Sequence, residues 1–233
     1  MWPGSRGRST FGPWLGNLRP TSNEMNAAAI RHLSTADPIL GALIAKVGPC
    51  DLKPDCTRSP FQALVQAVAH QQLNGKAANT ILTRFTALFP TRRFPSPEQV
   101  DAIDAHKITG VGFSRAKASY VKGIARAALD GLVPGRREIE RMLDDEIVER
   151  LTQIKGIGRW SVEMFLIFSL GRPDVLPIHD YGIHQGFAIA FRKRKLPEPE
   201  QILERGERWR PYRTTASWYL WRAVDLRDGK PTT

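Results

Sequence analysis

The segment Leu151-Thr-Gln-Ile-Lys-Gly-Ile-Gly-Arg-Trp160 places a Gly-x-Gly turn between two predicted helices. Glycine adopts positive φ at little cost, and without a Cβ it leaves the backbone amides open to a partner. The acidic residues 144–146 are typical of a helix start and predict a short helix over 144–153. A second helix is predicted over 159–169, with its first N–H groups pointing towards the turn. This arrangement favours sequence-independent binding of a nucleic-acid phosphate.

A second motif, Leu176-Pro-Ile-His-Asp-Tyr-Gly182, contains the carboxylate of Asp180, twenty residues after Trp160. A carboxylate fixed in a water-poor site can stabilise a developing positive charge or orient a water molecule for attack. Asp180 is equally suited to cap a helix that begins at Tyr181. The two roles are compatible, because capping holds the carboxylate in place. His179 is left without a role.

Together the two motifs resemble the helix-hairpin-helix DNA glycosylase superfamily, whose hairpin is followed by a glycine/proline-rich loop ending in an essential aspartate. The resemblance is strongest to the 3-methyladenine DNA glycosylase II branch. It implies a compact, two-lobed all-α fold with the active-site cleft between the lobes, and a catalytic role for Asp180. Further segments with counterparts in that branch are 60–64, 69–78, 209–213 and 218–221.

Helix signals with short connections continue along the chain, which predicts an all-α fold. The pairs Asp37-Pro38, Ser59-Pro60 and Ser96-Pro97 each combine an N-cap residue with proline at the first helical position. Residues 1–24 show neither a helical nor an alternating pattern and are predicted to be a disordered tail, ahead of one glycosylase domain over 25–233. Whether this tail belongs to the native protein is left open, because Met25 offers a second start.

The chain carries 34 Lys and Arg against 23 Asp and Glu, a formal net charge of +11. This basic balance favours a polyanionic partner, although it also fits a merely basic protein. No segment resembles a membrane span, so we expect a soluble protein without a membrane partner. Two cysteines, Cys50 and Cys56, are too few for a four-cysteine iron–sulfur cluster, and no zinc-ligand spacing is present.

The hairpin supplies the predicted DNA contacts. Phosphate is expected to bind the amides and side chains of Lys155, Gly156, Gly158 and Arg159. Relatives also hold a monovalent cation on hairpin carbonyls, which implies a structural Na⁺ or K⁺ on the backbone oxygens of Thr152, Ile154 and Ile157. No other cofactor and no catalytic metal are expected.

An enzyme that excises a base must extrude the nucleotide and fill the gap that it leaves. The resemblance places the inserting side chain at Gln72 or Leu73, although Leu73 also fits a core position. An alkylated base carries positive charge, and stacking on indole adds a cation–π contribution of ~0.5 to 2 kcal/mol. Core packing is the alternative for the tryptophans, and we expect it for at least one of them. The predicted pocket consists of Trp160, Met164, Tyr212, Trp218 and Trp221.

Bifunctional members of the superfamily carry a lysine nucleophile directly after the hairpin, where this chain has Trp160. The resemblance therefore implies a monofunctional glycosylase that uses water. Its partner is expected to be duplex DNA with damaged bases, and relatives act as monomers. A cytoplasmic, nucleoid-associated protein of bacterial type is expected, with an organelle or nucleus left open.

Two alternatives to this function remain. A non-catalytic helix-hairpin-helix module would need neither Asp180 nor the tryptophans. A glycosylase for another lesion would keep the fold and change the pocket. A second glycine segment, residues 108–117, is interpreted as another hairpin or as a turn that joins two packed helices.

Overall fold

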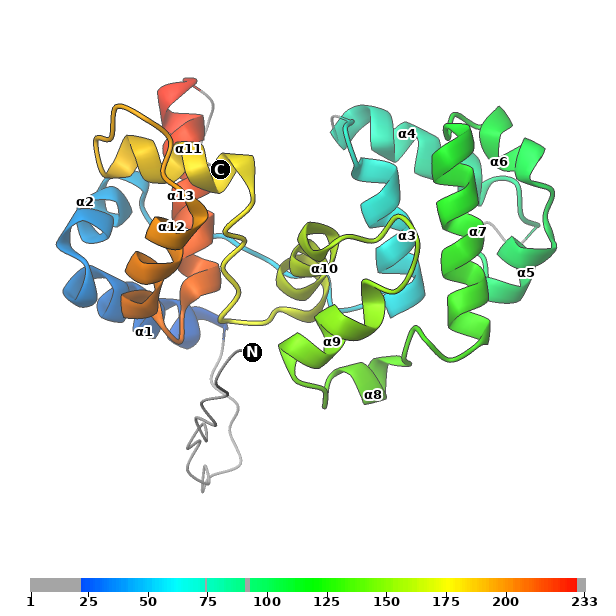
Figure 1. The fold of residues 1–233 in the computed structure, drawn as a ribbon, viewed down its shortest axis with the longest axis horizontal. Helices are drawn as coiled ribbons and strands as arrows, with labels where there is room; N and C mark the ends of the chain where they lie inside the picture. The colour runs from blue at the N-terminus through cyan, green and yellow to red at the C-terminus, as the bar shows by residue number, and fades with distance from the viewer. Residues whose placement is uncertain (1–21, 74, 91–92, 230–233) are drawn as a thin grey trace, which may run out of the picture.

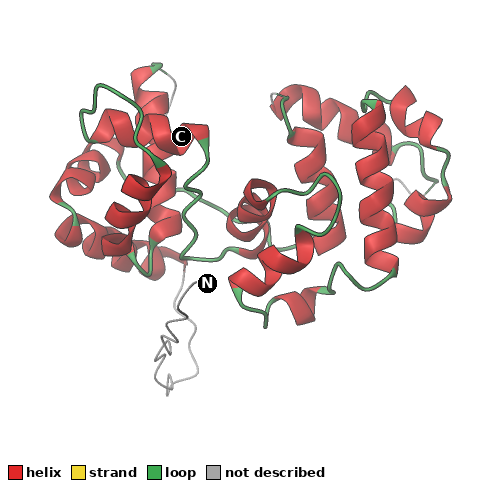
Figure 2. Ribbon diagram, viewed as in Figure 1, coloured by secondary structure: helices red, strands yellow, loops and turns green. Residues whose placement is uncertain are grey.

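The computed structural model describes residues 22–73, 75–90 and 93–229. Most of the predicted tail, residues 1–21, lies outside this range. The first helix begins at Ser22, three residues before the predicted domain start at Met25. All regular elements within the described residues are helical, which confirms the predicted fold class (Figure 2).

The helices form two lobes, which Figure 1 shows side by side. One lobe combines both ends of the described chain and contains α1 (Ser22–Ala36), α2 (Pro38–Val47), α11 (Tyr181–Ala190), α12 (Pro199–Gly206), the short η2 (Glu207–Trp209) and α13 (Arg213–Arg227). The other contains α3 (Pro60–His70), α4 (Gly75–Thr86), α5 (Pro97–Ala102), α6 (Ala105–Gly110), α7 (Arg115–Leu129), α8 (Arg136–Ile139), α9 (Asp144–Leu151), α10 (Arg159–Phe165) and the π-helical η1 (Leu166–Leu170). Each lobe has its own hydrophobic core.

The predicted helix starts at serine–proline and aspartate–proline pairs are confirmed. Ser59 accepts a hydrogen bond from the Gln62 amide (3.2 Å), and Ser96 forms a capping box with Gln99. Both side chains satisfy backbone donors that a helix start leaves without an intrahelical partner. Local capping thus sets these boundaries.

The predicted helix over 159–169 is interrupted. It is α-helical only to Phe165, and π-helical hydrogen bonding follows until Gly171 ends the segment at φ +66. A π-turn changes the angular position of the residues after it relative to a continuous α-helix. The exposed side chain of Phe168 lies within this turn.

A buried polar cluster stabilises the lobe of α1, α2 and α11–α13. Asp37 is fully buried and accepts hydrogen bonds from Arg205 (2.7 Å) and from the indole Nε1 of Trp209 (3.0 Å). Burial opposes ionisation of Asp37, but hydrogen bonds from Arg205 and Trp209 outweigh it and hold the pKa below its usual value. The cluster joins α2 to α12 and η2.

Helices α11 and α13 pack closely in this lobe. A Cβ on Gly186 would lie 2.0 Å from the carbonyl oxygen of Leu220, so only glycine permits this approach. The contact fixes α13 against the helix that begins directly after Asp180.

Two segments cross between the lobes, residues 48–59 and 171–180 (Figure 1). The first crossing is fixed to η1, where the Asp55 amide donates to the Phe168 carbonyl (2.8 Å). Asp174 anchors the second crossing by accepting from Arg210 (2.7 Å) and Arg213 (2.8 Å). This crossing ends at Asp180, which therefore lies at the junction of the lobes.

Within the described residues, no helix has both the length and the apolar content that a membrane crossing requires. The same residues contain no group of three or more His, Cys, Asp or Glu side chains that could hold a metal ion. Cys50 is a buried free thiol and Cys56 an exposed one.

Candidate active site and DNA-binding hairpin

The hairpin joins α9 to α10 as predicted. Gly156 has φ +90, and a Cβ at this position would lie 2.3 Å from the ring of Tyr120. Gly158 is the N-cap residue of α10, and a Cβ there would have no atom within 4 Å. Gly156 thus gives the turn its shape, whereas Gly158 leaves the N-terminus of α10 open.

The end of α3 holds the hairpin in place. The amide Nε2 of Gln71 donates to the Gly156 carbonyl (3.1 Å) and to Oγ of Ser161 (3.2 Å). Lys117 in turn donates from Nζ to the carbonyls of Ala69 (3.0 Å) and Gln71 (2.5 Å). Gln71 was not among the predicted site residues, and its only signal in the sequence was its position beside Gln72.

The predicted inserting residues are exposed. Gln72 lies in the left-handed region at φ 57, which is uncommon for a residue other than glycine. The Leu73 side chain is 41% exposed, so the alternative of a core position for Leu73 is wrong. Both residues lie directly after Gln71 and therefore next to the hairpin.

Asp180 is held by both lobes. Its Oδ1 accepts the Ile183 amide (2.9 Å), which confirms the predicted N-cap of α11, and the Nε1 of Trp221 from α13 (2.8 Å). Its Oδ2 accepts the Nε1 of Trp160 from α10 (2.7 Å). Three N–H donors from three helices therefore fix the orientation of one carboxylate.

Gly182 makes this arrangement possible. A Cβ on Gly182 would lie 2.9 Å from Cδ1 of Trp221 and 3.0 Å from Oδ1 of Asp180. The Trp221 indole and the Asp180 carboxylate thus approach each other next to Gly182, which carries no side chain. The sequence signal was the Asp-Tyr-Gly order, which predicted a helix start but not this contact.

The aromatic side chains beside Asp180 are partly exposed. Trp160 is 40% exposed and Phe168 is 41% exposed. The ring of Phe168 stacks on the indole of Trp221, with centroids 5.8 Å apart and planes at 23°. Phe168 was not among the predicted pocket residues, although it lies at the i, i+8 spacing from Trp160 that marks one helix face.

The other predicted pocket residues have different surroundings. Trp218 is 5% exposed and packs edge-on against Tyr219 in the core of its lobe. We therefore leave Trp218 out of the pocket. Tyr212 contacts the ring of His32 (5.4 Å between centroids), and Met164 packs partly buried against the core of the α3–α10 lobe.

Glu163 is a buried carboxylate in the same helix as Trp160. Its side chain is 6% exposed and accepts from Nε of Arg159 (3.1 Å), while Lys155 and Arg159 are exposed around the hairpin. Burial raises the pKa of Glu163, and the charge of Asp180 adds to this, whereas Arg159 opposes it. The two carboxylates therefore interact electrostatically.

The predicted cation site consists of hairpin carbonyls. The Ile154 oxygen accepts the Ile157 amide (3.0 Å), which leaves one of its two lone pairs for a cation. The oxygens of Thr152 and Ile157 complete the predicted set. Backbone oxygens are ligands that suit a hard monovalent cation, so the donor chemistry of these residues is compatible with Na⁺ or K⁺, and a bound cation stays a prediction.

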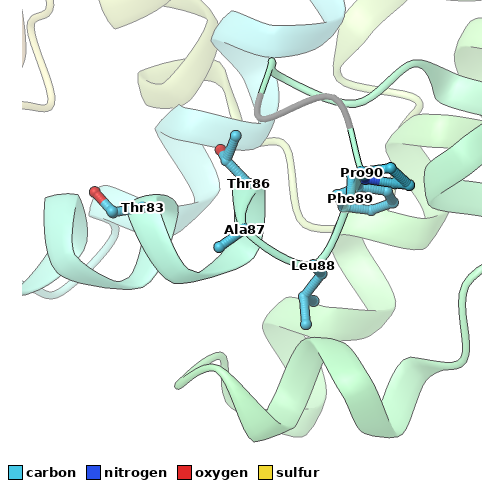
Figure 3. Close-up of a pocket in the computed structure, with 6 residues that line it drawn as sticks. All are labelled: Thr83, Thr86, Ala87, Leu88, Phe89 and Pro90. Carbon is cyan, nitrogen blue, oxygen red and sulfur yellow. The ribbon is translucent and has the colours of Figure 1, made fainter.

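A surface pocket lies elsewhere, at the C-terminal end of α4 (Figure 3). Its lining includes Thr83, Thr86 and Phe89 and none of the predicted site residues. The glycine segment 108–117 joins α6 to α7, and a Cβ on Gly112 would lie 3.0 Å from the Ile81 side chain. This close packing supports the interpretation of a turn between packed helices.

Comparison with known families identifies the fold. Residues 65–211 match the family described as "HhH-GPD superfamily base excision DNA repair protein". The chain belongs to this superfamily. The match confirms the helix-hairpin-helix resemblance inferred from the sequence and covers both the hairpin and Asp180.

Individual members of the HhH-GPD superfamily are similar over most of the chain. DNA-3-methyladenine glycosylase 1 of Schizosaccharomyces pombe is 42% identical over 200 residues, which are 84% of this chain and 87% of the relative. The solved structure of the Schizosaccharomyces pombe 3-methyladenine DNA glycosylase in complex with abasic DNA aligns with a TM-score of 0.78, covering 86% of this chain and 98% of that chain. A Bacillus halodurans DNA-3-methyladenine glycosidase aligns with a TM-score of 0.76 at 30% identity, covering 88% and 93%.

Proposed function

We propose that this protein is a monofunctional DNA-3-methyladenine glycosylase that hydrolyses the N-glycosidic bond of alkylated purines in duplex DNA and so initiates base excision repair. The observation that carries the proposal is the carboxylate of Asp180, fixed at the lobe junction by the indoles of Trp160 and Trp221. Binding of a DNA backbone by itself requires no such group.

DNA binding uses the hairpin. The open N-terminus of α10 at Gly158 offers amide donors to a phosphate, and Lys155 and Arg159 add positive charge. A Na⁺ or K⁺ on the hairpin carbonyls would add a further positive charge close to the phosphate. We propose that the protein acts on duplex DNA as a monomer.

Extrusion of the damaged nucleotide uses the turn after α3. Gln72 and Leu73 project from it, and the hydrogen bonds of Gln71 to Gly156 and Ser161 link this turn to the phosphate-binding hairpin. A side chain inserted into the stack compensates part of the few kcal/mol that base extrusion costs. The Gln71 hydrogen bonds thus hold the inserted side chain at a fixed position relative to the hairpin's contact with the DNA backbone.

The extruded base stacks beside Asp180. Trp160, Phe168 and Trp221 present aromatic surface there, and an alkylated purine carries the positive charge that such surface attracts. Discrimination by this interaction is modest, at ~0.5 to 2 kcal/mol. Most of the selectivity therefore comes from the alkylated base, which is already a good leaving group.

Asp180 then acts on the sugar. As the glycosidic bond lengthens, the sugar gains oxocarbenium character, which a fixed carboxylate stabilises electrostatically. Trp160, Ile183 and Trp221 each donate an N–H group to Asp180, which suits an acceptor-only carboxylate. Water completes the hydrolysis and leaves an abasic site. Because Trp160 stands where bifunctional enzymes carry lysine, we expect borohydride to trap no covalent adduct with damaged DNA.

The decisive experiment measures release of free bases from methylated duplex DNA by the wild type and by Asp180→Asn, with binding to DNA followed in parallel. An asparagine NH₂ would face one of the indole N–H groups, so the substitution removes both charge and orientation. We expect methylpurine release by the wild type, its loss in the variant, and retained binding. Tight binding without release by the wild type would favour a non-catalytic module or a different lesion.

A further inference from the structure

Glu163 is a buried charged side chain to which neither the fold nor the proposed reaction has yet given a role. A carboxylate with 6% exposure carries a desolvation cost that needs compensation. The fully buried Asp37 has hydrogen bonds from Arg205 and Trp209, whereas Glu163 is paired with Arg159, one helical turn earlier. An apolar side chain would fill this buried position without a desolvation cost, so core packing alone does not explain the acid at position 163.

Arg159 is the first residue of α10 and directly follows Gly158. Its side chain is 58% exposed, and its Nε is the atom that donates to Glu163. A guanidinium has five N–H donors, and use of Nε leaves the four on the two terminal nitrogens for another partner. These nitrogens belong to a side chain at the helix N-terminus, where the hairpin binds phosphate in the proposed function.

We propose that Glu163 is a positioning residue that holds the Arg159 guanidinium through Nε, so that its terminal nitrogens bind a DNA phosphate at the start of α10. The inference rests on the proposed DNA-binding function of the hairpin. Glu163 also lies three residues after Trp160 and so on a neighbouring helix position. The phosphate contact and the indole donor to Asp180 are thereby carried by one fixed helical turn.

The direction in which removal of the Glu163 charge changes the affinity for DNA distinguishes this positioning role from simple charge repulsion. Removal of a negative charge near DNA, with no other effect, leaves binding unchanged or strengthens it. Loss of the group that immobilises Arg159 weakens binding, because the free side chain must then be ordered when the complex forms. The two effects have opposite directions.

The test measures the dissociation constant of the full chain for a duplex with a tetrahydrofuran abasic-site analogue, by fluorescence anisotropy at several salt concentrations. We expect Glu163→Gln to weaken binding roughly three- to tenfold, because a neutral amide oxygen accepts the Nε–H group of Arg159 less strongly than a carboxylate does. Arg159→Gln should weaken it at least as much, and the double variant should bind no worse than Arg159→Gln, because Glu163 acts through Arg159. Glu149→Gln, an exposed acid on α9, is the matched control and should not weaken binding. Unchanged or tighter binding by Glu163→Gln, or losses that multiply in the double variant, would overturn the proposal.

Arg159→Lys gives an independent answer at an exposed position, even if Glu163→Gln does not fold. Lysine keeps the charge but has one nitrogen, which cannot serve Glu163 and a phosphate in the geometry of a guanidinium. We expect Arg159→Lys to lose most of the affinity that Arg159→Gln loses, and wild-type affinity in this variant would overturn the proposal. Base release from methylated duplex DNA is measured with the same protein preparations. Abasic-site binding without methylpurine release by the wild type would refute the proposed excision of methylated purines, and the binding data would still test the role of Glu163.

Discussion

The indole Nε1 of Trp221 donates a hydrogen bond of 2.8 Å to Oδ1 of Asp180, although 41 positions separate the two residues. Trp160 donates to the other oxygen from the opposite lobe. The carboxylate is thus oriented by α10 and α13 together, and its geometry depends on how the lobes are joined.

Trp221→Phe should slow base release about tenfold, because it removes an N–H donor to a charged acceptor, an interaction of about 1.5 kcal/mol or more, and keeps an aromatic ring. Trp218→Phe makes the same chemical change three residues earlier, in the core. It should lower the stability and leave the single-turnover rate within about twofold. Equal rates for Trp221→Phe and the wild type would contradict the assigned role of the hydrogen bond.

Gly182→Ala should reduce base release at least about tenfold, because the new Cβ would lie 2.9 Å from Trp221 and 3.0 Å from Asp180 and force them apart. Gly123→Ala is the control, since a Cβ in that part of α7 has no atom within 4 Å. There alanine should add up to about 1 kcal/mol of stability and leave the rate unchanged. A fully active Gly182→Ala enzyme would show that the contact is not required.

Gly156→Ala and Gly158→Ala should affect different properties. The first adds a Cβ 2.3 Å from the Tyr120 ring at φ +90 and should lower the free energy of unfolding by about 2 kcal/mol or more. The second has open space around it and should change stability by less than about 0.5 kcal/mol. Gly158→Ala should nevertheless weaken DNA binding, since the new Cβ occupies the approach to the α10 amides. Urea unfolding and DNA titration of both variants check this contrast.

Asp37→Asn should lower the free energy of unfolding by about 3 kcal/mol at neutral pH, because the Arg205 guanidinium loses its buried counter-ion. The pKa of Asp37 in the folded protein lies below its value in the unfolded chain, so its contribution is complete above the unfolded pKa. That contribution is lost as the pH falls through the folded pKa. Urea titrations of the wild type and of Asp37→Asn should therefore show a difference in the free energy of unfolding that is constant near pH 7 and becomes smaller below about pH 4. If this difference in the free energy of unfolding did not change with pH, an ionised Asp37–Arg205 pair would be refuted.

Much of the architecture follows from local sequence. Capping side chains and proline at the first helical position act within one turn of the helix, so Asp37-Pro38, Ser59-Pro60 and Ser96-Pro97 predict helix starts without knowledge of the fold. The Gly-x-Gly turn and Asp180 were likewise visible, because their chemistry resides in residue types at short spacing.

Which residues these side chains contact depends on the tertiary structure. Trp218 and Trp221 have the same side chain at i, i+3 spacing, yet Trp218 lies in the core and Trp221 contacts Asp180, because α11 packs on one face of α13. The link from Gln71 to the hairpin and the stack of Phe168 on Trp221 join segments that are 85 and 53 positions apart, counted as 156 − 71 and 221 − 168. The sequence by itself determined most of the helices, the hairpin and the position of Asp180 at a helix start, since these depend on local geometry. Only the tertiary structure decided which donors hold Asp180 and that Glu163 is buried, because both depend on how distant helices pack.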